Sequence, residues 1–403
     1  MDTEQVAAAR ASFTGAPNKF FDIVWRGGLL QIPTFGFYRF WLITEARRYL
    51  WSNTRIGDEG LEYTGQARQI LVGFLIAVAI LLPIYLAYFL LGLEAERLQA
   101  FASLPLFLIF YVLFQYASYR ARRYRLSHTS FRGLRFSMTG SGWAYAARAI
   151  GWDILTGLSL GLALPWREAS LERYRMSHTH FGSLTGSFAA TGGSFFKRAG
   201  WLWAVAVIGF VGLGAWFGVG AFQQTLAQAQ GRAMTINIQA PALFTVFSFA
   251  FLLVGVPLFK AIQLRWRLGG MRMGEAALGS ELTKGRIVAA YLKAAGAIFL
   301  LAIVFGLALF AYAATLGPSL TQFNVGQIPV TFLVGIAAIY LLFLACGNIL
   351  LLRFVTYNVW AAAASTLTVA NLAALEAAAA GGAPADQLGD GIADAFDFGG
   401  IGV

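Results

Sequence analysis

The chain has 403 residues, of which 58% are hydrophobic and 12% charged, and its formal net charge is +11. Soluble domains carry roughly 25% charged residues, so this composition excludes an ordinary soluble protein. Several apolar runs have about 20 residues, enough to cross a bilayer core, and predict a polytopic helical membrane protein. The basic residues flank these runs, as in cytoplasmic loops of membrane proteins, so we expect no nucleic-acid partner.

Eight apolar stretches follow one another along the chain. Two of them, 20–44 and 146–166, are broken by glycine and proline and predict re-entrant or interfacial helices. The other six predict three transmembrane hairpins: Ile70–Leu91 with Phe101–Tyr119, Trp201–Phe222 with Leu243–Leu264, and Tyr291–Thr315 with Thr331–Leu352.

Charge favours this arrangement over one in which the broken stretches also cross. If they do not cross, only Arg97 and Arg232 among the 30 Lys and Arg residues fall in the loops on the opposite side. Lys and Arg accumulate on the cytoplasmic side of membrane proteins. We therefore predict that both termini are cytoplasmic.

A short phrase recurs where basic helix ends meet the predicted cytoplasmic side. It consists of Tyr, Ser, Asn or His, Thr and a later Gly, and its first and third copies are offset by 125 residues, which indicates an internal duplication. The apolar alternation around each glycine indicates a tight turn or small β-hairpin. Weaker fourth and fifth copies begin at Arg265 and Arg353. The three clear copies are Tyr49, Ser52, Asn53, Thr54 and Gly57; Tyr124, Ser127, His128, Thr129 and Gly133; and Tyr174, Ser177, His178, Thr179 and Gly182.

The predicted fold class is accordingly an all-α polytopic membrane protein. It has six transmembrane helices in three hairpins, two re-entrant or interfacial broken helices, and short cytoplasmic turn or β-hairpin motifs. The predicted organisation is a first repeat over 1–125, a second repeat over 126–285, a third helical hairpin over 286–360, and a partly disordered Ala/Gly-rich acidic tail over 361–403.

Charged side chains near the apolar stretches are the candidate ligand-binding residues. An arginine precedes the Tyr of each phrase, at Arg48, Arg123 and Arg173. These arginines could set topology and snorkel toward lipid phosphates, or they could form a ring that binds an anionic ligand. Asp153 lies inside the second broken stretch, where an ionisable group is costly. It could line a pathway or pair with an arginine such as Arg148.

The only three histidines, His128, His178 and His180, all lie in the repeated phrase. Because Asn53 takes the same position in the first copy, a hydrogen-bonding structural role is expected there. His178 and His180 could supply two metal ligands, but a zinc site needs three or four. We therefore predict no metal, no cofactor and no catalytic residue.

Five segments resemble the YjgN-like family of bacterial inner-membrane proteins, whose domain has no known function. They are Phe13-Thr14-Gly15, 36–41 (GFYRFW), 47–54 (RRYLWSNT), 61–65 (LEYTG) and 161–166 (GLALPW). The resemblance implies a multi-pass protein of the bacterial inner membrane and no particular reaction.

Our leading functional prediction is transport or handling of an anionic solute or lipid without an ATPase of its own, because the chain lacks a Walker loop. Membrane lipids are expected partners. One alternative is a scaffold or assembly factor that binds proteins through its cytoplasmic face, and a third is an enzyme that uses His128 and His178. The acidic tail, which includes Asp394, could be disordered or dock on the basic face of the same molecule.

Overall fold

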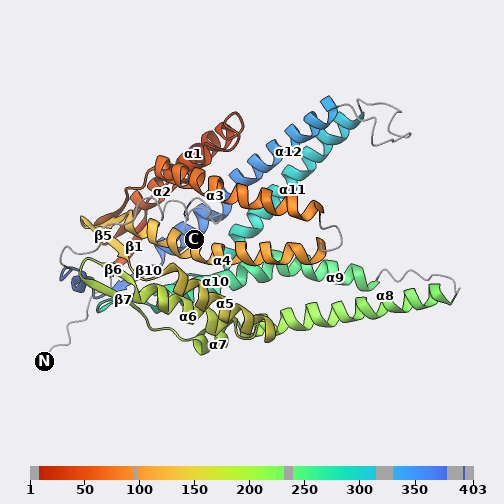
Figure 1. The fold of residues 1–403 in the computed structure, drawn as a ribbon. Helices are drawn as coiled ribbons and strands as arrows, with labels where there is room; N and C mark the ends of the chain where they lie inside the picture. The colour runs from red at the N-terminus through yellow and green to blue at the C-terminus, as the bar shows by residue number, and fades with distance from the viewer. Residues whose placement is uncertain (1–8, 95–98, 231–238, 315–329, 379–393, 395–403) are drawn as a thin grey trace.

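A computed structural model of the chain describes residues 9–94, 99–230, 239–314, 330–378 and Asp394. Helices extend from one end of the molecule, where short strands gather (Figure 1). The α-helices are α1 (Pro17–Leu30), α2 (Arg39–Ser52), α3 (Ala67–Glu94), α4 (Gln99–Ser127), α5 (Gly142–Leu158), α6 (Leu164–Ser177), α7 (Gly192–Val207), α8 (Leu213–Ala229), α9 (Gln239–Ala250), α10 (Val256–Gly270), α11 (Lys284–Ala314), α12 (Val330–Leu351) and α13 (Tyr357–Ser365). The π-helical turns η2 (Ile208–Gly212), η3 (Phe251–Gly255) and η6 (Leu352–Thr356) join α7 to α8, α9 to α10, and α12 to α13.

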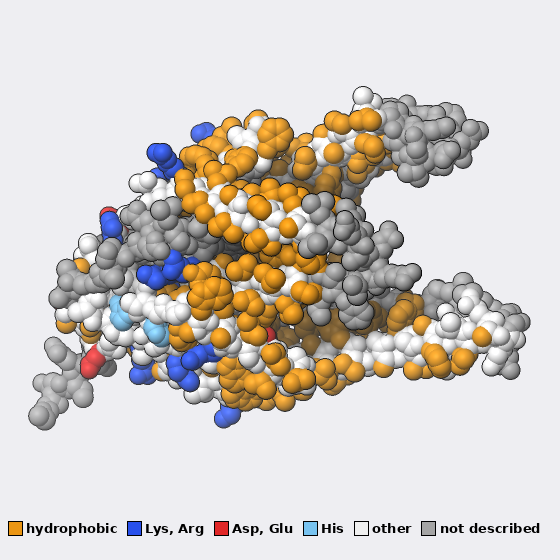
Figure 2. Space-filling view, in the orientation of Figure 1, with side chains coloured by type: hydrophobic (Ala, Val, Ile, Leu, Met, Phe, Trp, Pro, Cys, Tyr) orange, Lys and Arg blue, Asp and Glu red, His pale blue; other side chains and the backbone are white. Residues whose placement is uncertain are grey.

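Five helical segments of the described chain are long and apolar enough to cross a membrane. They are Ala67–Phe89, Gly192–Ala229, Pro241–Gly270, Lys284–Ala314 and Val330–Ser365. They contain most of five of the six predicted spans, whereas the sixth, Phe101–Tyr119, lies within α4. Hydrophobic side chains cover the helices, and Lys and Arg gather toward the strand end (Figure 2). These features describe a membrane protein with one basic end.

The prediction of an all-α fold is wrong, because ten strands close into an antiparallel β-barrel. Each strand pairs with its neighbours in sequence, and β1 closes the circle by pairing with both β2 and β10. The barrel is difficult to predict from the sequence because each strand has only three to five residues. The strands are β1 (Ala9–Phe13), β2 (Thr54–Ile56), β3 (Glu59–Tyr63), β4 (Thr129–Phe131), β5 (Leu134–Met138), β6 (Thr179–Phe181), β7 (Leu184–Phe188), β8 (Met271–Met273), β9 (Ala276–Ser280) and β10 (Leu367–Ala370).

The barrel consists of five hairpin-like units related by an approximate fivefold repeat. Four are continuous hairpins with glycine at the turn: Gly57, Gly133, Gly182 and Gly274 have φ between +55° and +74°, a region that favours glycine. The fifth unit pairs β10 with β1, so it is assembled from the two ends of the chain. The predicted fourth copy, which begins at Arg265, therefore corresponds to a real unit at α10–β8. A fifth unit is also present, at α13–β10, but the predicted start at Arg353 is out of register with it, because Thr366 takes the position of Asn53 there.

One backbone hydrogen bond recurs at each helix-to-strand joint and demonstrates the repeat. An amide from the strand end of one unit donates to the carbonyl just before the first strand of the next, at 2.8 to 3.0 Å. The five pairs are Thr14 to Asn53, Thr64 to His128, Thr139 to His178, Ala189 to Gly270, and Glu281 to Thr366. The five accepting residues therefore occupy equivalent positions around the barrel.

The two broken stretches are helix–turn–helix elements, α1–α2 and α5–α6. Their turns have the same backbone conformation: Phe35 and Leu160 have φ of +49°, and Gly36 and Gly161 have φ of +86°. Such values are uncommon for residues other than glycine, so the duplicates share a sharp and specific reversal. The reversal returns α2 and α6 to the barrel.

Candidate functional site

The repeated phrase ends a helix and starts a strand by side-chain hydrogen bonds to the helix backbone. The carbonyl of the phrase tyrosine accepts a bond from Asn53 Nδ2 at 2.7 Å in the first copy. His128 Nδ1 and His178 Nδ1 lie 2.9 and 2.7 Å from the corresponding carbonyls of the second and third copies. An amide and an imidazole therefore hydrogen-bond to the same carbonyl of the joint, which explains why the two residue types interchange.

The threonine after this position completes the joint in the same way in each copy. Thr54, Thr129 and Thr179 donate to the carbonyl four residues earlier at 2.8 to 2.9 Å. Such back-bonding satisfies a carbonyl that the helix end leaves free. In the fifth unit Thr366 occupies the position of Asn53, His128 and His178, and its hydroxyl donates to the corresponding carbonyl, that of Ala362, at 2.6 Å.

Five helices, α2, α4, α6, α10 and α13, end at the joints and surround the axis of the barrel. They enclose a cavity of about 560 Å³, which we call the axial cavity. Its wall includes apolar side chains such as Phe114, Leu264 and Trp360. Four arginines from three of these helices also line it: Arg122 and Arg125 of α4, Arg175 of α6 and Arg267 of α10.

A buried carboxylate holds three of these arginines together. Glu172 of α6 is 1% exposed and lies 2.8 Å from Arg122, 3.1 Å from Arg175 and 3.6 Å from Arg267, measured between charged atoms. Burial by itself would raise the pKa of Glu172, but the three guanidinium groups outweigh it and hold the pKa well below its usual range. Glu172 is therefore ionised and fixes the arginines on the cavity wall.

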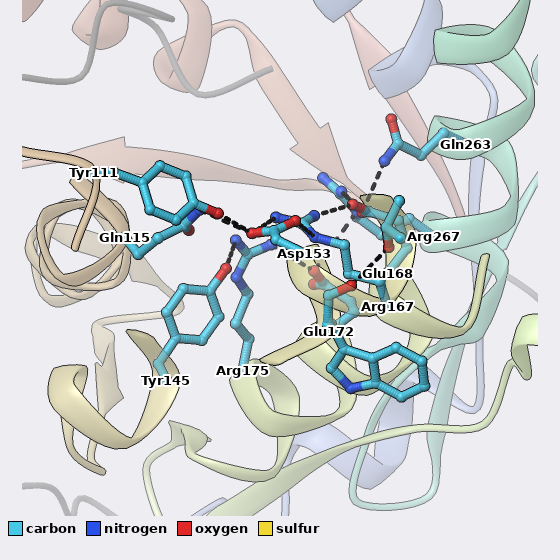
Figure 3. Close-up of polar contacts among 12 residues, drawn as sticks. Tyr111, Gln115, Tyr145, Asp153, Arg167, Glu168, Glu172, Arg175, Gln263 and Arg267 are labelled. Atoms are coloured by element: carbon cyan, nitrogen blue, oxygen red, sulfur yellow. Dashed lines mark hydrogen bonds and ion pairs between the residues drawn. The ribbon is translucent and has the colours of Figure 1, made fainter. Parts of the chain in front are cut away.

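A chain of polar contacts leads from this cluster to Asp153 (Figure 3). Arg267 lies 3.2 Å from Glu168, Glu168 contacts Arg167 at 2.8 Å, and Arg167 Nη2 donates to Asp153 at 3.1 Å. The Tyr111 hydroxyl also donates to Asp153. The suggested partner Arg148 instead lies over the Tyr174 ring, with its guanidinium carbon 4.9 Å from the ring centre.

Asp394 of the acidic tail occupies a second buried site beside the cavity. Its carboxylate, with a fully buried side chain, accepts two bonds from Arg47, at 2.6 and 3.1 Å, and lies 3.2 Å from Arg125. Arg47 also donates to the Tyr63 hydroxyl at 3.0 Å. Burial opposes the charge of Arg47, but the negative charge of Asp394 prevails and raises the pKa of the guanidinium. At this residue the tail docks on the same molecule.

The predicted arginines Arg48, Arg123 and Arg173 are not on the wall of the axial cavity. Arg48 and Arg173 are exposed, and Arg48 donates to the carbonyl of Gly65 at 2.8 Å. The cavity arginines lie at other positions of the same phrase. Arg125 and Arg175 follow the tyrosine, and Arg122 precedes it by two residues.

Helical periodicity was the available signal for the inner face. In the first copy Leu50 takes the position of Arg125 and Arg175, and it is fully buried. The preceding buried residue on that face of the helix is Arg47, and Arg48, one position later, is exposed.

The three histidines form hydrogen bonds within the barrel and its joints. His180 lies 3.0 Å from Thr139 Oγ1 and 3.2 Å from Thr185 Oγ1. His178 hydrogen-bonds to the carbonyl of Tyr174 at its joint. In the described part of the chain, no group of three His, Cys, Asp or Glu side chains could hold a metal ion.

Comparison with known proteins gives a family and no relative of known activity. No curated protein and no solved structure matches the chain. The family model described as a bacterial protein of unknown function, DUF898, matches residues 8–395. This match covers nearly the whole chain and agrees with the resemblance to the YjgN-like family. The chain therefore belongs to the DUF898 (YjgN) family of bacterial proteins of unknown function.

Proposed function

We propose that this protein binds an anionic head group or solute in the axial cavity, as part of transport or lipid handling in the membrane. The observation that carries the proposal is the presence of Arg122, Arg125, Arg175 and Arg267 on one cavity wall between apolar surfaces. Arginine binds phosphate and carboxylate groups in a bidentate manner, and its interactions strengthen in a site of low dielectric. Phosphate and carboxylate are therefore the expected ligand groups.

The charge of the polar network supports an anionic ligand. The groups joined through Glu172, Glu168 and Asp153 comprise three carboxylates and four arginines, an excess of one positive charge; the arginines are Arg122, Arg167, Arg175 and Arg267. Burying unbalanced charge is costly unless a counter-charge is present. A phosphate group or a carboxylate would reduce this imbalance.

The arrangement of the apolar hairpins supports access from the bilayer. In the most hydrophobic stretch of each of the five apolar segments, only 6% to 17% of the residues are buried inside the protein. The hairpins α8–α9 and α11–α12 also diverge as they leave the barrel (Figure 1). Because so little of these segments is buried and the hairpins diverge, an amphiphile in the bilayer can reach the inner helices. A scaffold would not need an arginine-lined cavity.

Paired arginine substitutions test the proposal. Arg267→Gln and Arg175→Gln remove cavity charges, and Arg265→Gln and Arg173→Gln are controls, because these exposed arginines lie two residues earlier on the same helices. Hydrogen bonds to charged groups are worth about 1.5–3 kcal/mol, so each cavity variant should weaken binding about tenfold or more. Binding is measured with the full chain in neutral-lipid nanodiscs, using inorganic phosphate in one arm and phosphatidylglycerol in the other.

The two arms distinguish a free solute from a lipid head group. Phosphate binding without competition from phosphatidylglycerol would favour a solute, and the reverse a lipid. Equal losses in the cavity variants and their controls, with all proteins monodisperse, would refute the axial site and favour the predicted set that contains Arg173.

We further propose that the barrel faces the cytoplasm of a bacterial cell, at the inner membrane, with both termini on that side. The supporting observation is the concentration of Lys and Arg at the barrel end (Figure 2). Cysteines introduced in 223–241 should react with a membrane-impermeant reagent from the periplasm. Reaction only after lysis would contradict this orientation.

A further inference from the structure

The inside of the β-barrel contains a second cavity, of about 190 Å³, which we call the barrel pouch. Side chains that point inward from the strands form an almost wholly apolar wall. They include Ile56, Phe131, Phe136, Phe181, Met273 and Leu278. Small barrels are usually filled by such side chains, so the remaining volume is the feature that needs an explanation.

Leu375 lies over one end of the pouch, and the other end adjoins the axial cavity. Leu375, from the short 3-10 helix η7 (Leu372–Leu375), packs against the cluster of Phe131, Phe181 and Met273. At the opposite end Arg122 lines both the pouch and the axial cavity, as do the apolar side chains of Leu61, Leu126 and Met271. An apolar space therefore adjoins the guanidinium group of Arg122.

This combination is suited to a molecule with one charged and one apolar end. An apolar cavity of about 150 Å³ can stay dry and bind apolar molecules, so the pouch has a suitable size and lining for part of an alkyl chain. Because each buried methylene is worth about 0.8 kcal/mol, a chain that enters the pouch should strengthen binding about fourfold per methylene. A cavity of about 190 Å³ is suited to a single alkyl chain.

Starting from the anion site proposed above, on which this step rests, we propose that the axial cavity and the barrel pouch together bind a single-chain anionic amphiphile. Its phosphate or carboxylate lies at Arg122, Arg175 and Arg267, and its alkyl chain enters the barrel. The ligand thus turns its apolar end toward the strands.

An alkyl phosphate series tests the placement of the chain. Ethyl, butyl, hexyl and octyl phosphate are titrated into the full chain in neutral-lipid nanodiscs, and affinity should rise about fourfold per methylene until the pouch is full. Ala276→Phe fills the pouch, because Ala276 is fully buried and lines it, whereas Ala277→Phe makes the same change on the other side of β9. Ala276→Leu is a milder filling variant in case the larger side chain prevents folding.

We expect both filling variants to flatten the dependence on chain length, without changing the affinity for ethyl phosphate, and Ala277→Phe to behave as wild type. A wild-type chain-length dependence in folded Ala276→Leu would place the alkyl chain toward the bilayer and overturn the proposal. Failure of the wild-type protein to bind ethyl phosphate would instead refute the anion site, and the amphiphile site with it.

Discussion

Glu172 offers the sharpest test of how the arginines are held. Glu172→Gln keeps the size of the side chain and removes a charge that three arginines share at 2.8, 3.1 and 3.6 Å. Breaking a buried ion pair by removing one partner typically costs about 3–5 kcal/mol. The arginine side chains here remain 18% to 27% exposed, so we expect the lower end, about 3 kcal/mol.

The control for this substitution is Glu59→Gln. Glu59 pairs with Arg132 at 3.3 Å, but its side chain is 47% exposed. Surface pairs of this kind are worth about 0–1 kcal/mol. Thermal unfolding of the two purified variants should therefore differ, with the melting temperature of Glu172→Gln lower by at least about 5 °C.

The pH dependence gives a second readout of the same interaction. Because the folded protein holds the pKa of Glu172 well below its usual range, the stabilisation is fully present above the ordinary carboxyl pKa. It is lost only as pH falls through the lowered value. The stability difference between wild type and Glu172→Gln should stay constant from neutral pH to about pH 5 and narrow only in stronger acid. Equal melting temperatures for the Glu172→Gln and Glu59→Gln variants would refute the reasoning.

Two further predictions concern the docked tail and the joints. Asp394→Asn removes the carboxylate charge that pairs with the fully buried Arg47 and should destabilise the protein by about 3 kcal/mol in chemical or thermal unfolding; a loss below about 0.5 kcal/mol would show that the docked carboxylate contributes little. Burial lowers the pKa of His128, so its neutral form is favoured on folding, and stability should fall as pH drops through about 6.5 toward the lowered value. His128→Asn copies the natural joint at Asn53 and should fold while losing part of this acid sensitivity in melting curves between about pH 5 and 8, and an unchanged acid sensitivity would contradict the role given to His128.

Much of the helical part could be predicted because its signals are local. Long apolar runs predicted the membrane segments, and the breaks at Gly36 and Gly161 marked reversals that do have the backbone conformation glycine favours. The alternation around Gly57 and Gly133 indicated hairpins. Closure of the hairpins into a barrel is not local, since β1 pairs with β10 across almost the whole chain. No pattern within a three-residue strand such as β2 reports that partner.

The site was harder to predict for the same reason. Sequence repetition pointed to arginines in the phrase, but it could not tell which of several neighbouring arginines face the axis. Asp153 was expected near an arginine, and its partner Arg167 lies across the reversal at Gly161, beyond any single helix turn. Asp394 and Arg47 are separated by nearly the full chain, and only charge complementarity connected them in advance.

The union of β1 with β10 has a consequence for biosynthesis. A growing chain can make the hairpins β2–β3 to β8–β9 in turn, but the ring stays open until Leu367–Ala370 leaves the ribosome. Until then β1 and β9 each present an edge that lacks its β10 partner, and such edges invite pairing with other chains. The first strand of the nascent protein must therefore stay available for pairing while the membrane helices between β1 and β10 are inserted. The ring can close only after every strand has been made.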